Sequence, residues 1–369
     1  MKILRPTWAE VDLANIALNI NAIKDFVGSK VGILAVVKAD AYGHELVKVA
    51  AALENTPVNM FGVATVEEGI QLRQSGIKKD ILILGSIYPF KNFKEVVNFD
   101  LTPTVASVAG LEALEKYCLK SGKRVPFHLK IDTGMARIGL SPSTAAVVLP
   151  KIRKLKKAYM EGIYTHLACG DTQNDFTKTQ FLEFKKIVSR AKSAYKHIAA
   201  SASIINYRNS YFNLVRPGLL IYGLLPFKNA ANYIPVKPAL ELKTKIVFLK
   251  SVPKNTSISY GRTFYTGRAS RVATVPIGYA DGLSRHNSNN AHMIVNGRKV
   301  PVVGSVCMDM TMLNVTGIPG VSVGSEVVVI GSQGGQTITA EDVAAGTRTI
   351  NYEVLTSISK RVPRIYKGI

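Results

Sequence analysis

The stretch GILAVVKADAYGH, residues 32–44, begins as an apolar run with β-branched residues and ends that run on a lysine, Lys38. A short, continuous apolar run is typical of a parallel strand that is buried on both of its faces. A lysine is costly to bury as a charged group, so an apolar setting lowers its pKa and leaves part of it neutral and nucleophilic. The stretch therefore predicts a buried strand that delivers a reactive amine at its carboxyl end.

The first 220 residues repeat this kind of run. Seven further candidate strands follow, at residues 60–65, 80–86, 102–107, 125–132, 159–168, 197–201 and 213–218. Amphipathic stretches separate most of them, and one more, residues 13–27, precedes the first strand with apolar residues at helical spacing. Eight strands that alternate with helices predict a (β/α)8 TIM-like barrel.

The pattern changes after about residue 235, where short strands follow one another with turn signals between them. Asn296 and Gly297 form a hairpin signal, because both turn positions favour positive φ. One amphipathic helix is expected over residues 339–359, with Thr339 as its N-cap. The sequence thus predicts two domains, a barrel over residues 1–235 and a mostly-β C-terminal domain over 236–369, with the linker at 226–238.

The net charge of +22 is the one extreme feature of the composition. The basic residues are spread along the chain, and the densest cluster, residues 151–157, is expected to be one solvated helix face. No nucleic-acid-binding motif matches, so we interpret the charge as a basic surface that attracts small anions. No apolar run is long enough to span a membrane, and three scattered cysteines fit no zinc site. The expected location is the cytoplasm, with no metal, membrane or nucleic-acid partner.

Chemistry in a barrel of this kind is expected at the carboxyl ends of its strands. The unusual residues found there are Lys38, Lys130, Arg137, His166, Ser201, Arg216 and Gly218. One such residue alone is more often structural, but this many together favour an active site. Ser201 and Gly218 follow the last two strands, where barrels commonly bind phosphate. A Schiff-base lysine with a phosphate site is consistent with pyridoxal 5'-phosphate (PLP), although the pattern leaves an aldolase-type lysine open.

The stretch VVKADAYGH resembles the PLP-attachment signature of alanine racemases. Further motifs of that family follow in its order and cover nearly the whole chain: LKIDTGMARIG (129–139), YTHLA (164–168), RPGLLIYG (216–223), SYG (259–261), IGYADG (277–282), VCMDM (306–310) and TINYEVLTSISKRVPRIY (349–366). The resemblance implies a PLP-binding barrel followed by a β domain. It also implies an isomerase that takes a small amino acid as its substrate.

The resemblance assigns the catalytic roles. Lys38 would carry PLP as an aldimine and act as one of two bases. Tyr260 would be the second base, reaching into the site from the partner subunit of a homodimer. His166 would lie between Arg216 and Tyr260 and, with Arg216, form a cationic neighbourhood. Arg216 would also face the pyridine nitrogen of PLP.

The resemblance also assigns contacts to phosphate, substrate and entry channel. The phosphate contacts would be Tyr42, Ser201, Gly218, Leu219 and Tyr352, with Ser203 as the alternative to Ser201. Arg137 and the backbone of Met308 would contact the substrate carboxylate, and Arg137 also the O3′ side of the cofactor. The channel positions would be Tyr279, Asp171, Arg285 and Ile350. Lys130 would be carbamylated beside Arg137; the alternative is an unmodified lysine that pairs with Asp132 or solvent.

The implied function is the interconversion of L-alanine and D-alanine by two bases, which supplies D-alanine for peptidoglycan. A PLP-dependent decarboxylase is one alternative, but that class places a carboxylate, not an arginine such as Arg216, at the pyridine nitrogen. A PLP-carrier protein is another, but it resembles the barrel alone. A racemase of serine or lysine stays open, because small changes in a pocket decide that preference.

Overall fold

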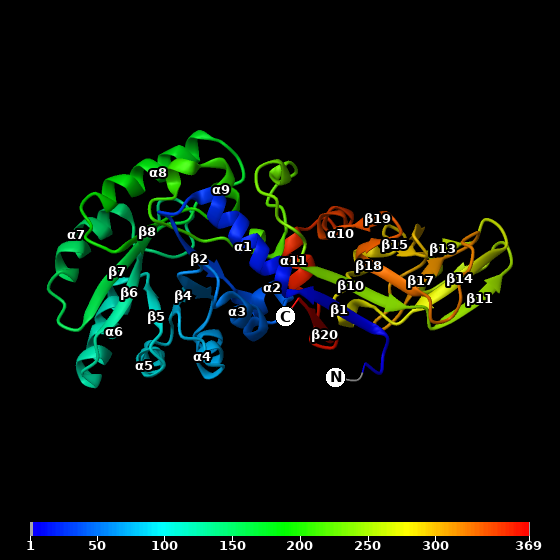
Figure 1. Ribbon diagram of the computed structural model, residues 1–369, viewed down its shortest axis with the longest axis horizontal. Helices are drawn as coiled ribbons and strands as arrows, with labels where there is room; N and C mark the ends of the chain where they lie inside the picture. The colour runs from blue at the N-terminus through cyan, green and yellow to red at the C-terminus, as the bar shows by residue number, and fades with distance from the viewer. Residues whose placement is uncertain (1–2, 369) are drawn as a thin grey trace. The chain divides into compact units, whose positions relative to one another are not determined.

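The computed structural model describes residues 3–368, and its contacts divide the chain into two compact units (Figure 1). The barrel unit consists of residues 16–41 and 46–237. The C-terminal unit consists of residues 238–369 together with residues 1–15 and 42–45. No helix within residues 3–368 combines the length and the apolar character needed to cross a bilayer.

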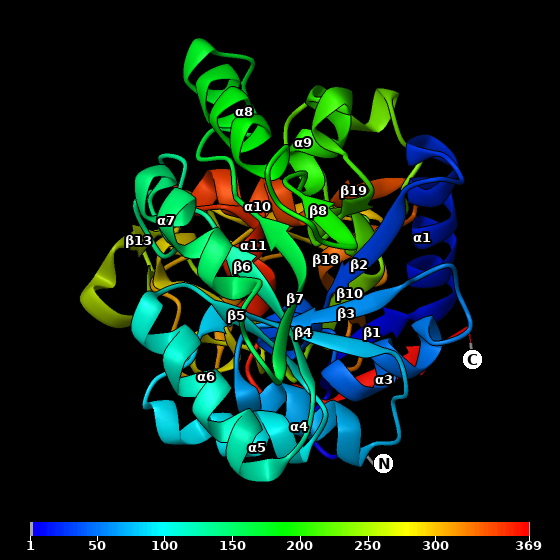
Figure 2. The same cartoon turned by 90° about the vertical axis from the view of Figure 1, so that its left-hand side faces the viewer.

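Eight parallel strands form the sheet of the barrel unit, in the order β8-β7-β6-β5-β4-β3-β2-β9 (Figure 2). A bridge between Ala200 and Arg216 joins the two ends of this order and closes the ring. The predicted (β/α)8 barrel is therefore confirmed. The strands are β2 (Gly32–Val36), β3 (Met60–Val63), β4 (Asp80–Ser86), β5 (Thr102–Val105), β6 (Val125–Lys130), β7 (Ala158–Tyr164), β8 (Tyr195–His197) and β9 (Leu214–Val215).

Helices lie outside the ring of strands, as Figure 2 shows for α4, α5, α6 and α7. The helix expected over residues 13–27 is found with those bounds. The helices around the barrel are α1 (Leu13–Val27), α3 (Leu46–Leu53), α4 (Val66–Gln74), α5 (Phe93–Asn98), α6 (Val108–Ser121), α7 (Pro142–Ile152), α8 (Asp175–Val188) and α9 (Ser201–Asn206).

The expectation of one helical face over residues 151–157 is wrong, because α7 ends at Ile152. The carboxylate of Glu115 accepts hydrogen bonds from the backbone N–H groups of Lys156, Lys157 and Ala158, and so holds this segment as a loop that leads into β7. A single acidic side chain from another helix thus offers these amides an alternative to helical hydrogen bonds.

Within the described residues, the C-terminal unit contains three sheets, in which every strand pairing is antiparallel except that of β1 with β20. The largest has the order β16-β15-β18-β10-β1-β20, with β19 beside β18, and the others are β11-β14-β17 and β12-β13. Its strands are β1 (Thr7–Asp12), β10 (Leu240–Lys245), β11 (Phe248–Val252), β12 (Ser257–Ile258), β13 (Phe264–Tyr265), β14 (Ser270–Val275), β15 (His292–Val295), β16 (Arg298–Pro301), β17 (Thr311–Asn314), β18 (Glu326–Gln333), β19 (Gln336–Ile338) and β20 (Arg364–Lys367). The predicted mostly-β domain is confirmed.

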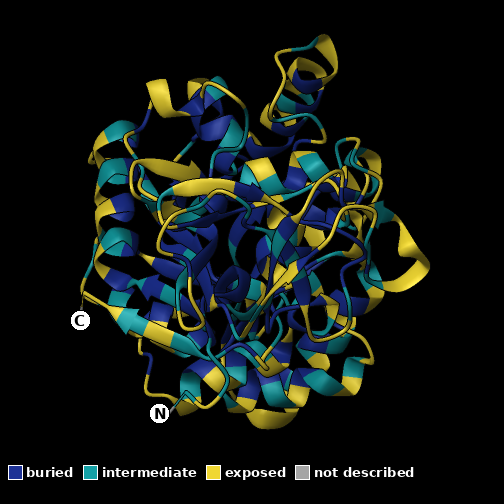
Figure 3. Ribbon diagram, turned by 90° about the vertical axis from the view of Figure 1, so that its right-hand side faces the viewer, coloured by how far each residue is buried: buried dark blue, intermediate teal, exposed yellow. Residues whose placement is uncertain are grey.

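Strand β1 pairs antiparallel with β10 and parallel with β20, so the first residues of the chain belong to the C-terminal unit. The predicted barrel domain, residues 1–235, includes these residues, so its boundary differs from the observed one. The hairpin at Asn296 and Gly297 joins β15 to β16, with φ of 47° and 73° at the two positions. Exposed residues, yellow in Figure 3, lie on loops but also on helices and on outer strands, since β11 and β16 are mostly exposed.

The helix expected over residues 339–359 is two helices, α10 (Ala340–Thr347) and α11 (Asn351–Thr356). Thr339 is the N-cap of α10, as predicted, and its hydroxyl accepts from the N–H of Asp342. The expected helix is interrupted at Arg348, which adopts a left-handed conformation with φ of 56° and so terminates α10.

Glu10 on β1 connects three adjacent strands at one end of the large sheet, β10, β1 and β20. Its carboxylate accepts hydrogen bonds from Lys243 on β10, at 3.0 Å, from Lys367 on β20, and from the indole of Trp8, at 2.9 Å. Burial alone would raise the pKa of Glu10. The hydrogen bonds from Lys367, Trp8 and Lys243 outweigh this effect, and the pKa falls to about 2. Because the folded-state pKa lies below the ordinary value, Glu10 stabilises the fold above about pH 4.5 and loses this effect as the pH falls toward 2.

We therefore expect Glu10→Gln to lower the melting temperature at pH 7 by roughly 1–2 °C, the shift expected for about 1 kcal/mol in a chain of this length. The difference between the two proteins should shrink toward pH 3. Thermal unfolding followed by circular dichroism at both pH values measures it, and an equal difference at both would contradict the assignment.

Candidate active site

Lys38 lies two residues after the end of β2 and begins a helical turn, α2 (Lys38–Gly43), of unusual hand. Residues 39–42 have φ between 53° and 55°, so the turn is left-handed although none of these four residues is glycine. Such a conformation costs roughly 1–2 kcal/mol per residue, and backbone strain of this kind is concentrated at functional sites. The reactive lysine predicted from the sequence is thus presented by a strained turn.

The amine of Lys38 is half-buried. Burial lowers its pKa, the nearby Arg137 guanidinium lowers it further, and the Glu68 carboxylate opposes both effects. A lowered pKa increases the neutral, nucleophilic fraction of the amine at neutral pH. The side chain of Arg137 itself is exposed.

Arg216 is the buried cation at the end of β9. It donates from NH1 to His197 Nδ1 at 2.8 Å, and from NH2 to His166 Nδ1 at 3.1 Å and to the carbonyl oxygens of Thr165 and Ile198. Burial lowers its pKa to about 10, so the guanidinium is still protonated at neutral pH. Four hydrogen bonds therefore hold one positive charge in a fixed orientation.

The expected cationic neighbourhood of His166 and Arg216 is wrong for His166. A guanidinium can only donate, so the Nδ1 atom of His166 must accept and its proton lies on Nε2. Burial and then the charge of Arg216 lower the pKa of His166 well below its usual value, which makes the imidazole neutral. Arg216 alone supplies positive charge to this pair.

A chain of hydrogen bonds continues from Arg216 into the interior of the barrel. His197 accepts from Arg216 and, with its remaining N–H, donates from Nε2 to His128 Nδ1 at 2.8 Å. His128 Nε2 then lies 3.6 Å from the carboxylate of Glu161. Both imidazoles are fully buried, and burial lowers the pKa of each. The hydrogen bonds connect the guanidinium to two neutral rings and fix their tautomers, and the N–H of His128 Nε2 points toward the Glu161 carboxylate without a hydrogen bond to it.

Lys130 is buried at the end of β6. Its Nζ donates to the Ile131 carbonyl at 3.0 Å and lies 5.2 Å above the ring of Tyr164. Burial lowers the pKa of Lys130 to about 7, and the charge of Arg216 contributes in the same direction. Asp132, the partner considered for an unmodified lysine, accepts instead from the N–H groups of Gly134 and Ala136.

Two loops at the ends of β8 and β9 meet at Ser201. Its Oγ accepts from the N–H of Gly218 at 2.9 Å and of Leu220 at 3.4 Å, so the hydroxyl hydrogen is left to donate. Within residues 3–368, the N–H of Leu219 has no hydrogen-bond partner, whereas the N–H of Ser201 faces the Arg216 carbonyl in the bridge that closes the barrel. The Leu219 N–H and the hydroxyl hydrogen of Ser201 are therefore two donors that fit an anion such as phosphate. The hydroxyl of the alternative residue, Ser203, is engaged with Ala200.

In the C-terminal unit, the SYG motif forms a strained loop. Ser259, Gly261 and Arg262 all have positive φ, at 67°, 72° and 52°. Ser305 Oγ donates to the Tyr260 carbonyl at 2.9 Å and anchors the loop from the neighbouring segment. The side chain of Tyr260 is 73% exposed. The backbone therefore presents a phenol outward from its own unit.

The IGYADG and VCMDM motifs are packed against each other through backbone contacts. Tyr279 and Ala280 donate their N–H groups to the carbonyls of Cys307 and Met308, each at 3.0 Å. A Cβ on Gly278 would lie 2.2 Å from the Cys307 carbonyl oxygen, so only glycine allows this approach. The N–H of Met308 has no partner among the residues that the structure describes, which leaves it available to a ligand.

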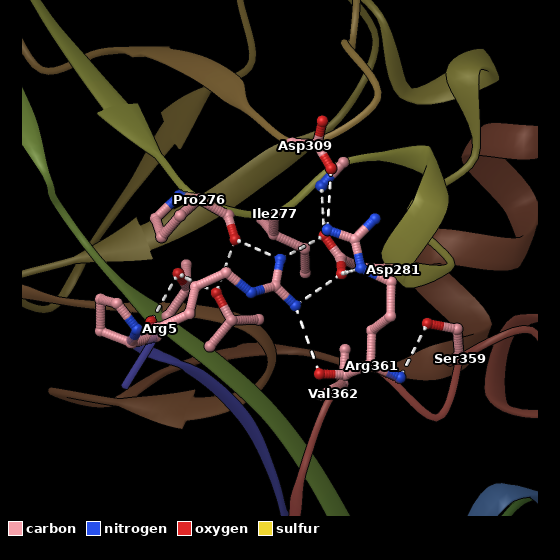
Figure 4. A network of polar contacts seen from close by, with 12 residues as sticks. Arg5, Pro276, Ile277, Asp281, Asp309, Ser359, Arg361 and Val362 are labelled. Carbon is pink, nitrogen blue, oxygen red and sulfur yellow. Dashed lines mark hydrogen bonds and ion pairs between the residues drawn. The ribbon is translucent and has the colours of Figure 1, made fainter. Parts of the chain in front are cut away.

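An ion network holds these motifs in place (Figure 4). Arg5 donates to both oxygens of the fully buried Asp281, at 2.8 and 2.6 Å, and Arg361 donates to Asp309 at 2.8 Å. The guanidinium of Arg361 also lies 3.6 Å from Asp281. Asp309 is thus a structural partner of Arg361, and the network ties the segment before β1 to the segment before β20.

Tyr42 and Tyr352, both predicted phosphate contacts, are neighbours within the C-terminal unit, with ring centroids 5.8 Å apart. Burial raises the pKa of Tyr42, so its phenol is a hydrogen-bond donor at neutral pH. The four predicted channel residues are all exposed: Tyr279, Asp171, Arg285 and Ile350.

Further residues of the site have no predicted role from the sequence. Tyr164 stacks on His197 at 4.7 Å between ring centroids and lies 5.2 Å from the Arg216 guanidinium. Polar residues inside otherwise apolar strands, such as His128 in β6, were the available signal for the buried chain. Glu68, which accepts from the N–H of Ala39, had no sequence signal beyond its place at an acidic helix start.

The chain matches the family model "Alanine racemase, N-terminal domain" over residues 11–226 and "Alanine racemase, C-terminal domain" over residues 239–366. It is 43% identical to the alanine racemase of Halothermothrix orenii, over 100% of this chain and 98% of that protein. It is 45% identical to alanine racemase 2 of Caldanaerobacter subterraneus, over 98% of this chain and 95% of that protein. A solved alanine racemase structure from Clostridium difficile 630 has a TM-score of 0.93 at 37% identity and covers 99% of this chain and 97% of its own. Full-length similarity in both units shows that the chain belongs to the alanine racemase family.

Proposed function

We propose that this protein interconverts L-alanine and D-alanine with PLP as its cofactor. One observation carries the proposal: in a chain of this family, the half-buried Lys38 is presented by a strained turn and has a lowered pKa. Bound PLP supplies the electron withdrawal that makes the α-hydrogen of the amino acid acidic. The residues fit this cofactor, because the barrel unit offers an amine at Lys38, two donors in the Ser201 hydroxyl and the Leu219 N–H, and a fixed cation at Arg216.

Two bases on opposite faces of the substrate explain inversion. A single base tends to return the proton to the face from which it came, which preserves configuration. We assign Lys38 to one face and Tyr260 to the other. The outward presentation of Tyr260 supports donation of this phenol to a second subunit, and hence a homodimer with shared active sites.

The proposal also includes the residues that bind the substrate and the phosphate, the residues that line the entry, and the cellular use of D-alanine. Arg137 and the N–H of Met308 bind the substrate carboxylate, and Tyr42, Tyr352 and Gly218 add to the phosphate contacts. Tyr279, Asp171, Arg285 and Ile350 line the entry to the site. The product D-alanine supplies peptidoglycan synthesis in the cytoplasm.

Incubation of the holoenzyme with L-alanine in D₂O tests the function. We expect D-alanine to form with deuterium at the α-carbon, because inversion passes through exchange of the α-hydrogen with a base. Chiral chromatography with mass spectrometry measures both quantities. Formation of neither D-alanine nor α-deuterated alanine would overturn the proposal.

We also propose that Lys130 is carbamylated. An amine with a pKa of about 7 is largely neutral above that pH, and its nitrogen attacks CO₂, forms the N–C bond and releases a proton. The resulting carbamate is an anion beside the cation of Arg137. With ¹³C-bicarbonate we expect a carbamate signal in the ¹³C spectrum that grows as the pH rises through 7. The signal should be absent in Lys130→Ala, and its persistence there would assign it to another amine.

Arg216 is expected to control which reaction follows proton removal. If Arg216 faces the pyridine nitrogen of bound PLP, its guanidinium would disfavour a proton on that nitrogen and so would limit the electron withdrawal that the cofactor supplies. In Arg216→Glu, transamination of L-alanine to pyruvate should rise on the order of tenfold or more relative to racemisation, a change of about 1.4 kcal/mol in relative barriers. A lactate dehydrogenase assay measures pyruvate. Arg216→Lys, which keeps the charge, is the control, and an unchanged ratio in Arg216→Glu would contradict the argument.

A further inference from the structure

Glu68 makes two short hydrogen bonds to backbone N–H groups from different segments. Its Oε1 accepts from the N–H of Ala39 at 2.7 Å, and its Oε2 accepts from the N–H of Ala64 at 2.7 Å. Ala39 is the residue directly after Lys38, and Ala64 directly follows β3. One carboxylate therefore ties the start of the left-handed turn to the end of the neighbouring barrel strand.

This arrangement differs from an ordinary helix cap. Glu68 stands in the first turn of α4, where Thr65 is the N-cap and accepts from the N–H of Glu68. In a capping box the acidic side chain would return to the N–H of Thr65 itself. Here the two oxygens bind Ala64 and Ala39 instead, so the side chain reaches beyond its own helix to the segment that holds Lys38.

The left-handed turn needs such a contact. Its first N–H groups lack partners within the turn, as at the start of any helix, and its backbone conformation is intrinsically unfavourable. A charge-assisted hydrogen bond is stronger than a neutral one, and this bond fixes the plane of the peptide group that joins Lys38 to Ala39. That peptide group adjoins the Cα atom of Lys38, so its orientation constrains the direction in which the side chain leaves the backbone. Asp40 adds a second support by accepting from the N–H of Leu46 at 2.9 Å.

We propose that Glu68 is a positioning residue for Lys38, whose carboxylate holds the left-handed turn and places a negative charge near the amine. The inference rests on the proposed function in taking Lys38 as the lysine that binds PLP and transfers the proton. The charge of Glu68 acts on the pKa of Lys38 in the direction opposite to burial and to Arg137. Its removal should therefore favour the neutral amine.

Glu68→Gln keeps the size of the side chain but leaves one oxygen for two N–H groups and removes the charge. We expect the turnover number to fall on the order of 10²-fold, the loss that follows a small displacement of a reacting group. Glu67→Gln is the matched control, because Glu67 is exposed in the same helical turn. It should retain the activity of the unchanged protein.

Two measurements on the protein stripped of PLP separate positioning from general damage. Hydrogen–deuterium exchange should become faster at the Ala39 amide in Glu68→Gln and stay unchanged in Glu67→Gln. The rate at which Lys38 captures added PLP, trapped with borohydride and located by mass spectrometry, should have its midpoint at lower pH in Glu68→Gln. Glu68→Asp keeps the charge and shortens the reach, so its midpoint should stay near that of the unchanged protein while its Ala39 amide exchanges faster.

Unchanged protection of Ala39 together with an unchanged capture midpoint in Glu68→Gln would overturn the inference. Equal effects of Glu67→Gln would do the same. Should Glu68→Gln fail to fold, Glu68→Asp carries the exchange measurement. If the unchanged protein does not racemise alanine, the proposed function fails, whereas exchange and capture still decide the role of Glu68.

Discussion

Tyr260→Phe should abolish racemisation while leaving one enantiomer of alanine able to exchange its α-hydrogen with solvent. Lys38 still serves its own face of the substrate, so the enantiomer whose α-hydrogen points to Lys38 loses and regains a proton without inversion. The other enantiomer has no base. Loss of a positioned general base lowers a rate typically by about 10²–10⁴-fold. The exchange of each enantiomer is measured separately in D₂O by proton NMR.

Tyr265→Phe is a suitable control for this variant. Tyr265 is another exposed phenol close to Tyr260 in sequence, and its ring lies under the guanidinium of Arg262 at 5.5 Å. Its removal should leave racemisation in both directions unchanged. Retained racemisation in Tyr260→Phe, or equal loss of exchange for both enantiomers, would show that this phenol is not the second base.

A mixture of two inactive variants should recover activity if the active site is shared between subunits. Lys38→Ala lacks one base and Tyr260→Phe lacks the other. In a mixed dimer, one site combines both defects and the other site combines the intact Lys38 with the intact Tyr260. Random exchange of equal amounts of the two variants makes about half of all dimers mixed, and each mixed dimer has one intact site out of two. About one quarter of the normal activity should therefore return.

The recovery is measured after the two variants are unfolded together and refolded, or after long incubation at low concentration. Each variant treated alone provides the background. A phenol that served the lysine of its own chain would give no recovery, because neither chain in the mixture carries both residues. Recovery therefore distinguishes a shared site from a self-contained one.

Periodicity and motif order were sufficient for the barrel, the β domain, the hairpin at Asn296 and the N-cap at Thr339, because these depend on local patterns of apolar and turn residues. The same reasoning failed where a distant side chain intervened. Glu115 ends the helical segment after Ile152, and no pattern within residues 151–157 could reveal it. The break at Arg348 likewise required a backbone conformation that arginine rarely adopts.

The fold class and the chemical identity of the groups at the strand ends follow from the amino-acid order, because burial requires apolar runs and chemistry requires particular side chains. The protonation and orientation of those groups depend on three-dimensional packing. His166 is neutral because Arg216 donates to it, and Lys38 is presented by a left-handed turn that Glu68 holds. Both depend on hydrogen bonds between residues far apart in the chain, whose geometry only the folded structure fixes.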